Sequence, residues 1–248
     1  MAHTLASACI ALSVAVVSLN HQSIRSAEWG AALQSLVEDA RLGYASSPAD
    51  VVTRLVVTLE KDRAVLKRFP RHEQLLAISR DGEIVDIIDG TDRSVVVAGR
   101  LDALLAHEGA DILLVHNHPT STALSVADVG QLENPGVRGI VAIGADGSIY
   151  AAFPERRLPR GRGHVLYTAA QQEILGAVRS SPQAVPQGFL DSIFGHVLAE
   201  SLRDVGVIAY EARPAPTASR LLTIMKPYCR FAREVATARL RRELKRLG

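Results

Sequence analysis

The spacing of apolar and polar residues changes several times along the chain, and each change marks an expected element. Over residues 23–44 apolar side chains recur at helical spacing, which predicts an amphipathic helix. The run Ser46-Ser47-Pro48-Ala49-Asp50 predicts the start of a second helix, expected to end near Leu59. A serine cap, a proline in the first turn and an acid near the positive end of the helix dipole all favour this start. A charged connection is expected at residues 61–71.

Short apolar runs separated by turn residues predict β-strands in the middle of the chain. Residues 74–79 and 83–88 flank Asp81-Gly82, which predicts a β-hairpin. Further strands are expected at residues 94–98, 111–118, 139–144 and 148–153. Helices are expected at residues 101–107, ended by Gly109, and at residues 125–132. Because helices and strands interleave, we predict a mixed α/β domain over residues 47–158.

The last third of the chain is expected to be mainly helical. A linker is expected at residues 159–163, and helices at residues 165–179, 189–204 and 217–248, with a break at residues 180–188. The predicted organisation is therefore an N-terminal segment (1–46), an α/β domain (47–158) and a helical region with a basic tail (159–248).

Composition narrows the class of protein without naming a partner. Of the 248 residues, 48% are hydrophobic, which is enough for a sizeable core, and the net charge is only +2. The two cysteines, Cys9 and Cys229, form no disulfide or metal framework, which fits a reducing, cytoplasmic compartment. The uncharged run at residues 5–19 is too short for an ordinary membrane span and lacks the basic start of a signal sequence. We therefore expect no membrane association.

The run His116-Asn117-His118-Pro119 has the pattern of a metal site at the end of a strand. Side chains alternate across a strand, so His116 and His118 share one face, beyond a buried apolar stretch, and Pro119 then stops the strand. Two neutral imidazoles are typical zinc ligands, and a catalytic zinc site adds a third protein ligand and an open position. The sequence therefore predicts a divalent metal site, with zinc (Zn²⁺) as the ion.

Asp128 is the expected third ligand. Ser125 can cap the helix that begins there, which places Asp128 at the third helical position, and residues 120–124 are few and polar enough to turn back over the strand end. The alternative is that His116 and His118 are unrelated surface histidines and that Asp128 only favours its helix dipole.

Glu73 is the candidate general base, because it directly precedes the apolar strand at residues 74–79. A carboxylate at a strand entrance, flanked by an apolar core, is expected to face the site with a raised pKa. Composition alone favours the alternative, a solvated acid paired with Arg71 or Lys67.

These residues, in this order, resemble the JAB/JAMM (MPN+) metalloprotease family, most closely its RadC-like bacterial branch. The resemblance rests on His116-Asn117-His118-Pro119 with Ser125-x-x-Asp128, and extends to Ser47-Pro48-Ala49-Asp50-Val51 and His72-Glu73-Gln74-Leu75-Leu76. It covers about residues 47–153. In three respects the sequence departs from the family pattern. The stretch from Pro119 to Ser125 is one residue shorter, and the glycine that normally follows His-Pro-Ser is missing from residues 120–124. The strand at residues 139–144 also lacks the Asp-His pair usual in that branch.

The resemblance implies a mixed β-sheet flanked by helices and a zinc-dependent hydrolase. His116, His118 and Asp128 would be the zinc ligands, Glu73 the general base, and Ser125 a donor to the oxyanion. The implied reaction is hydrolysis of a peptide or isopeptide bond, with a protein or peptide substrate that is often ubiquitin-like.

Three rival readings stay open. A nuclease of the HNH type would need its three residues dispersed over a ββα finger rather than joined in a tripeptide. A non-catalytic binding module would keep the fold without the base. Residues 226–248 carry eight basic residues and two acids, a composition that phosphate binding would use. The alternative for this tail, which we prefer, is a solvated helix whose Leu240, Leu244 and Leu247 pack on a partner.

Overall fold

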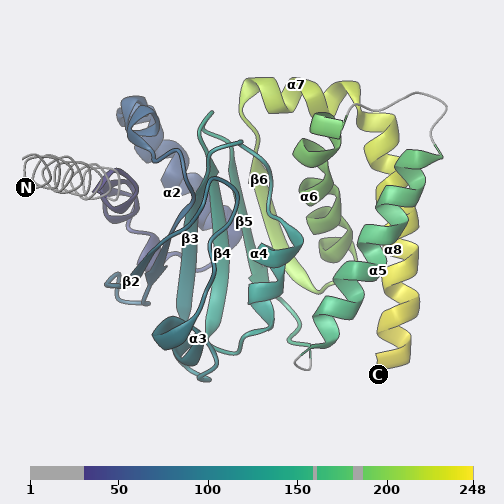
Figure 1. Cartoon of the computed structure of the whole chain (residues 1–248), viewed down its shortest axis with the longest axis horizontal. Coiled ribbons are helices and arrows are strands. Elements are labelled where there is room, and N and C mark those ends of the chain that lie inside the picture. Colours follow the sequence, from purple (N-terminus) through teal and green to yellow (C-terminus); the bar gives the residue numbers. More distant parts are fainter. Residues whose placement is uncertain (1–30, 159–160, 181–186, 248) are drawn as a thin grey trace, which may run out of the picture.

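The computed structural model describes residues 31–158, 161–180 and 187–247 (Figure 1). Across these residues six strands form one sheet in the order β2-β1-β3-β4-β5-β6. The strands are β1 (Gln74–Ile78), β2 (Ile84–Asp89), β3 (Ile112–His118), β4 (Val137–Gly144), β5 (Ile149–Pro154) and β6 (Ile208–Arg213). The central neighbours β3 and β4 are parallel, and the other neighbouring pairs are antiparallel. The predicted mixed α/β class with a helical C-terminal region is confirmed.

Helices lie on both sides of this sheet. They are α2 (Pro48–Lys61), α3 (Gly99–Leu105), α4 (Val126–Gly130), α5 (Arg162–Arg179), α6 (Gln187–Asp204), α7 (Pro216–Ile224) and α8 (Lys226–Leu247). Three short 3₁₀ helices connect them: η1 (Leu42–Tyr44), η2 (Arg63–Arg68) and η3 (Gln131–Glu133). Figure 1 shows α5, α6 and α8 gathered at one side of the molecule and α2 at the other. No helix in the described part of the chain has the length and apolar character needed to cross a membrane.

The sheet separates two hydrophobic cores, because successive side chains on each strand point to opposite faces. In β3, Leu113 and Val115 join the core beneath α2, whereas Ile112 and Leu114 join the core beneath α4, α5, α6 and α8. All four are almost fully buried. Each such side chain contributes about 1.5–3 kcal/mol on burial. Burial therefore fixes which side chains of β3 point to each face of the sheet. The next residue, His116, must face the same side as α4.

The start of α2 is confirmed where the sequence predicted it. The Ser47 side chain accepts a hydrogen bond from the Asp50 backbone N–H at 3.2 Å, and Pro48 occupies the first turn. The Asp50 carboxylate in turn accepts a bond from the Ser46 N–H at 3.1 Å. These contacts satisfy donors that a helix start otherwise leaves free. Residues 31–39 of the first expected helix are helical, and the run at residues 5–19 lies outside the described residues.

The expected strand at residues 94–98 is wrong. The segment belongs to no strand of the sheet. Val95 and Val97 instead pack against the larger core, while Val96 is 73% exposed. The alternating valines therefore reflect which side chains pack on the core and not pairing with a neighbouring strand. Helix α3 also ends earlier than expected, with Ala106 as its cap, and Gly109 with φ of 93° belongs to the turn that follows.

The C-terminal region contains a strand that the sequence did not reveal. Strand β6 pairs antiparallel with β5 and completes the sheet, with Tyr210 opposite Ala152. In the expected linker, Gly163 already belongs to α5 and is buried close to Glu133, while residues 159–160 lie outside the described part. The core beneath α4 combines residues from both sides of position 158. The domain boundaries at 46 and 158 stay predictions.

Candidate metal centre

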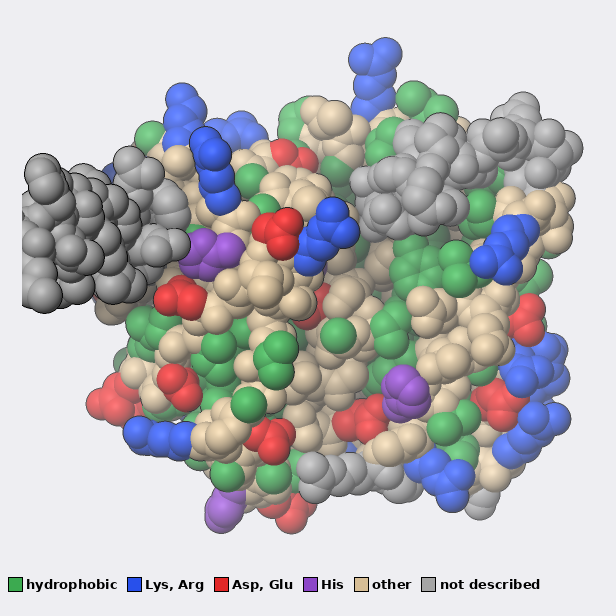
Figure 2. Space-filling view, in the orientation of Figure 1, with side chains coloured by type: hydrophobic (Ala, Val, Ile, Leu, Met, Phe, Trp, Pro, Cys, Tyr) green, Lys and Arg blue, Asp and Glu red, His purple; other side chains and the backbone are tan. Residues whose placement is uncertain are grey.

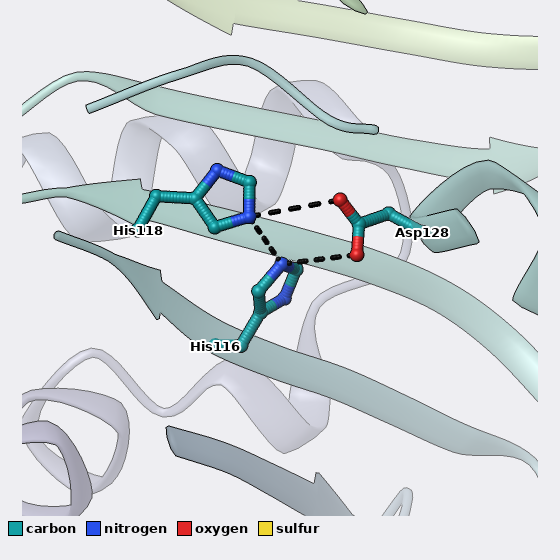
Figure 3. Close-up of side chains that lie close together, drawn as sticks. All are labelled: His116, His118 and Asp128. Carbon is teal, nitrogen blue, oxygen red and sulfur yellow. Dashed lines mark hydrogen bonds and ion pairs between the residues drawn. The ribbon is translucent and has the colours of Figure 1, made fainter. Parts of the chain in front are cut away.

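The two histidines lie close together at the buried end of β3. His116 and His118 follow Leu114 on the same face and are 2% and 4% exposed. Their Nε2 atoms lie 2.8 Å apart, and both point towards the first turn of α4 (Figure 3). Sequence alternation alone predicted this shared direction, and the structure shows it.

Asp128 meets the two imidazoles from α4. Its Oδ1 lies 3.2 Å from His116 Nε2, and its Oδ2 lies 3.6 Å from His118 Nε2. A capping box holds the aspartate, because the Ser125 hydroxyl accepts from the Asp128 N–H at 3.1 Å and the Asp128 carboxylate accepts from the Ser125 N–H at 2.6 Å. The carboxylate is therefore fixed by its own helix start before any ion binds.

The short loop between strand and helix still reaches far enough. Ser121 adopts a left-handed conformation with φ of 58°, and its N–H donates to the His118 carbonyl at 3.0 Å. Its hydroxyl accepts from the Asp146 N–H at 3.0 Å, which ties the loop to the turn after β4. This tight turn brings Asp128 to the histidines although the loop between Pro119 and Ser125 is short.

The donor set fits zinc. Two imidazoles and one carboxylate leave a fourth position for another group, as in a catalytic zinc site. The separations of 2.8, 3.2 and 3.6 Å between ligand atoms lie around the roughly 3.3 Å that tetrahedral ligands at about 2.0–2.1 Å from zinc would show. Among the described residues, these three form the one group of three or more His, Cys, Asp or Glu side chains whose ligand atoms all lie within 4.8 Å of one another.

One further contact sets the protonation of a ligand. His118 Nδ1 lies 2.7 Å from the Thr122 carbonyl, to which only a protonated nitrogen can donate. The proton therefore sits on Nδ1, and Nε2 keeps its lone pair for a metal. Nδ1 of His116 makes no well-formed hydrogen bond, although the Val141 backbone is close enough to favour a protonated ring.

The charges of the three groups suit a metal at neutral pH. Burial and the neighbouring His116 lower the pKa of His118 to about 4, so this ring is neutral. Burial would raise the pKa of Asp128, but His116 and His118 outweigh it and hold that pKa far below its usual range. Burial likewise opposes protonation of His116, yet the charge and hydrogen bond of Asp128 raise its pKa overall. A cation entering the site thus meets an ionised carboxylate and replaces at most one proton.

Glu73 lies in the wall of a cavity that also contains two of the candidate ligands. Leu75 pairs with His116 across β1 and β3, so the side chain two positions before Leu75 shares its face and lies towards His118. The cavity, hereafter the site cavity, has a volume of about 510 Å³. Burial, above all, raises the pKa of Glu73, and the negative charge of Asp128 adds to this effect. The residues that line the site cavity are Glu73, Arg93, Ser94, Val95, His118, Thr120, Thr122, Ser125, Ala127 and Asp128.

The alternative for Glu73, a solvated acid paired with Arg71 or Lys67, has no support in the contacts. All three residues are described, and neither basic side chain forms an ion pair with Glu73. Half-buried carboxylates with raised pKa values are characteristic of acid–base sites.

Ser125 combines a structural contact with a free donor. Its oxygen accepts the Asp128 N–H, a bond that leaves the hydroxyl hydrogen unused, and the residue lines the site cavity. A serine hydroxyl can donate and accept at once, so capping does not prevent a second role.

Sequence reasoning missed two residues around the ligands. Thr122 holds His118 through its backbone carbonyl, a group that every residue carries, so no sequence signal could have identified it. Asn117 was passed over as the middle of the tripeptide. It is 1% exposed, and its side chain is hydrogen-bonded to the segment that carries Glu73. A buried amide between two ligand histidines was the available signal.

Comparison of the chain with protein-family models, with curated proteins and with solved structures gave no match.

Proposed function

We propose that the protein is a zinc-dependent hydrolase of peptide or isopeptide bonds, of the JAB/JAMM type that its motif resembles. The observation that carries the proposal is the position of Glu73. A half-buried carboxylate with a raised pKa shares the site cavity with His118 and Asp128, two of the three candidate ligands. A structural metal site does not require a carboxylate that is not a ligand, whereas a hydrolytic site requires a general base beside the ion.

The roles of the residues follow from their positions. Zinc held by His116, His118 and Asp128 would polarise the scissile carbonyl and make a nearby water more acidic. The Glu73 carboxylate takes a proton from the attacking water, whose oxygen bonds to the carbonyl carbon. When the C–N bond breaks, Glu73 returns that proton to the leaving amine. The Ser125 hydroxyl donates a hydrogen bond to the carbonyl oxygen as negative charge develops on it.

The substrate is a protein or peptide, and the family resemblance suggests ubiquitin-like conjugates as one source.

A reducing, cytoplasmic compartment belongs to the same proposal. Cys229 is a free, partly buried cysteine, and burial raises the pKa of its thiol to about 11, which keeps it protonated and unreactive.

The test separates catalysis from metal binding. Purified protein is loaded with zinc and incubated with a proteome-derived peptide library, and new amino termini are read by mass spectrometry. Glu73→Gln should lower cleavage by about 10²–10⁴-fold, because it removes the base. Its zinc content should stay unchanged, because Glu73 is not a ligand. Glu83→Gln, an exposed acid outside the site cavity, serves as the matched control. Equal cleavage by the wild type and Glu73→Gln would remove Glu73 from the mechanism.

A second candidate function is a non-catalytic binding module that contacts nucleic acid through α8. Helix α8 packs along α5 and α6, and Ala236 and Leu240 are fully buried in the core. Leu240, Leu244 and Leu247 thus pack on the chain itself rather than on a separate partner. Figure 2 shows basic side chains along the edge of the molecule where α5 and α8 lie. The basic side chains of α8 that remain exposed are Lys226, Arg230, Arg241, Arg242, Lys245 and Arg246.

The acidic residues of α8 do little to neutralise the basic side chains at its C-terminal end. Glu243 is buried and shared between Arg239 and Arg246, so Arg241, Arg242 and Lys245 have no acidic partner among the described ion pairs. A rigid basic surface of this kind favours a polyanion.

Salt dependence tests this second function. Binding of a labelled DNA duplex is measured between about 50 and about 200 mM salt, for the wild type and for the triple change of Arg241, Arg242 and Lys245 to Glu. Lys61, Arg63 and Lys67, changed to Glu together, form the matched control, since they are exposed residues of α2 and η2, which pack into the core on the other face of the sheet from α8.

The α8 variant should bind the duplex more weakly than the wild type does. Its salt slope should fall by about 0.9 for each phosphate that the variant no longer neutralises. The control variant should keep the slope of the wild type. Equal decreases in affinity for both triple variants would reject a specific role for α8.

A further inference from the structure

The middle residue of the histidine tripeptide is hydrogen-bonded to the backbone at the start of β1 and just before it. Asn117 points to the face opposite His116 and His118, as strand alternation requires. Its Nδ2 donates to the carbonyls of Pro70 at 3.3 Å and His72 at 3.0 Å, and its Oδ1 accepts from the Gln74 N–H at 2.8 Å. Both donors and the acceptor of this buried amide are therefore used.

All of these bonds go to the backbone on either side of Glu73. The ladder between β1 and β3 begins only at Leu75, opposite His116, so the residues before it have no strand partner in β3. The Asn117 side chain takes the place of that missing ladder. On the outer side, the Glu73 N–H donates to the Thr91 carbonyl at 2.6 Å, and the Glu73 carbonyl accepts from the Gly90 N–H at 2.8 Å.

A second layer of polar contacts supports the same segment. The Gln74 side-chain Nε2 donates to Asp89 Oδ1 at 2.8 Å, and His72 Nε2 lies 3.6 Å from that oxygen. Asp89 ends β2, so the edge of the sheet also holds the residues that flank Glu73. The backbone that carries the Glu73 carboxylate is thus fixed from both sides, although it lies outside any strand.

We propose that Asn117 is a positioning residue that fixes Glu73 relative to the metal ligands. One short stretch of β3 supplies His116 and His118 to the site on one face and holds the base from the other face. The same strand therefore carries the two histidine ligands and an anchor for the base, while Asp128 comes from α4. This inference rests on the proposed hydrolase function, because it assigns a purpose to the position of Glu73.

Asn117→Ser is the main test variant, because the serine hydroxyl ends one bond short of the amide oxygen and nitrogen, so the bond from the Gln74 N–H is lost together with those to the two carbonyls. Asn117→Ala is the more severe variant. Ser201→Ala is the matched control: Ser201 is fully buried in α6, and its hydroxyl donates to the Val197 carbonyl at 2.8 Å. It removes a buried side-chain-to-backbone bond that is remote from the site cavity.

The first readout is backbone amide exchange, which requires no substrate. In Asn117→Ser, exchange at Gln74 and Glu73 should accelerate by up to about tenfold more than at the amides of α6, the size expected from removal of one hydrogen bond. In Ser201→Ala, Gln74 and Glu73 should change no more than the rest of the protein does. Equal acceleration at Gln74 in both variants would overturn the positioning role.

The second readout is a double-mutant cycle on peptide cleavage. Asn117→Ser should lower kcat in the wild type with little change in KM and with zinc stoichiometry retained. It should cost nothing further in the Glu73→Gln background, because its whole effect passes through that residue. The same decrease in both backgrounds would overturn the proposal. If the wild type cleaves no peptide, the hydrolase proposal fails, and the exchange readout alone decides whether Asn117 holds the segment.

Discussion

Removal of His118 should abolish the effect of zinc on stability. His118→Ala deletes one of three ligand atoms that lie 2.8 to 3.6 Å apart. A ligand at about 100 times its Kd stabilises the folded state by about 2.7 kcal/mol. For a chain of about this size, 1 kcal/mol shifts Tm by about 2–4 °C, so zinc at that concentration should raise the Tm of the wild type by about 5–11 °C.

The same substitution should also weaken the metal-free protein. It removes the hydrogen bond from His118 Nδ1 to the Thr122 carbonyl at 2.7 Å, which costs about 1 kcal/mol. The two effects are separable, because the first depends on zinc concentration and the second does not. Differential scanning calorimetry of the metal-free protein, followed by zinc titration, measures both, with metal content determined by mass spectrometry.

His196→Ala provides the matched control. His196 is a half-buried histidine of α6 that is hydrogen-bonded to the Tyr210 hydroxyl at 3.0 Å, away from the candidate ligands. It should lower the Tm of the metal-free protein while retaining the zinc-dependent rise. A zinc-dependent rise of equal size in His118→Ala and the wild type would refute the assignment of the metal site.

Three further changes test the fold. Leu240→Ala should destabilise the protein by about 2–5 kcal/mol in denaturant unfolding, because Leu240 is a fully buried residue of α8. Ser47→Ala should cost about 1 kcal/mol in the same assay, since the Asp50 N–H loses its cap. The hydrogen bond from Arg233 lowers the pKa of Asp204. The resulting stability is present above the ordinary carboxyl pKa of about 3.9 and is lost as pH falls through the lowered value. Asp204→Asn should therefore be less stable than the wild type at neutral pH, and the difference should vanish in acid. A difference that persists unchanged at low pH would contradict this reasoning.

Local chemistry explains which elements were predictable from the sequence. The start of α2 was predicted because Ser47, Pro48 and Asp50 act within one turn of chain. The strand β3 was predicted because its apolar run is buried on both faces, as expected at the centre of a sheet. In each case the residues that define the element are also those that stabilise it.

The elements that sequence reasoning missed depend on distant partners. Strand β6 lies between helices in the sequence, and its identity comes from β5, which pairs with it across the intervening α5 and α6. Residues 94–98 carry the alternation of a strand but find no partner strand in the described part of the chain. Alternation predicts which side chains are buried, but strand pairing depends on a partner strand in another part of the chain.

The candidate site also has features that the sequence predicts and features that depend on distant contacts. The direction of the histidines and the cap that places Asp128 follow from the periods of strand and helix, so both could be predicted. Whether Glu73 faces the same cavity depends on the register between β1 and β3, which the sequence does not contain. The Thr122 contact uses a backbone carbonyl, which any residue at that position would supply. The Asn117 amide is visible in the sequence, but the backbone groups that it bonds are not.

The two faces of β3 carry different functional side chains, and this limits how its sequence can evolve. Substitutions in its apolar part alter packing at one position at a time, so they can be accommodated one by one. Deletion or insertion of a single residue between Ile112 and His116 would instead exchange the two faces of everything that follows. The imidazoles would then turn into the core beneath α2, and the Asn117 amide would enter the site cavity. The strand can therefore vary in residue type but not in length.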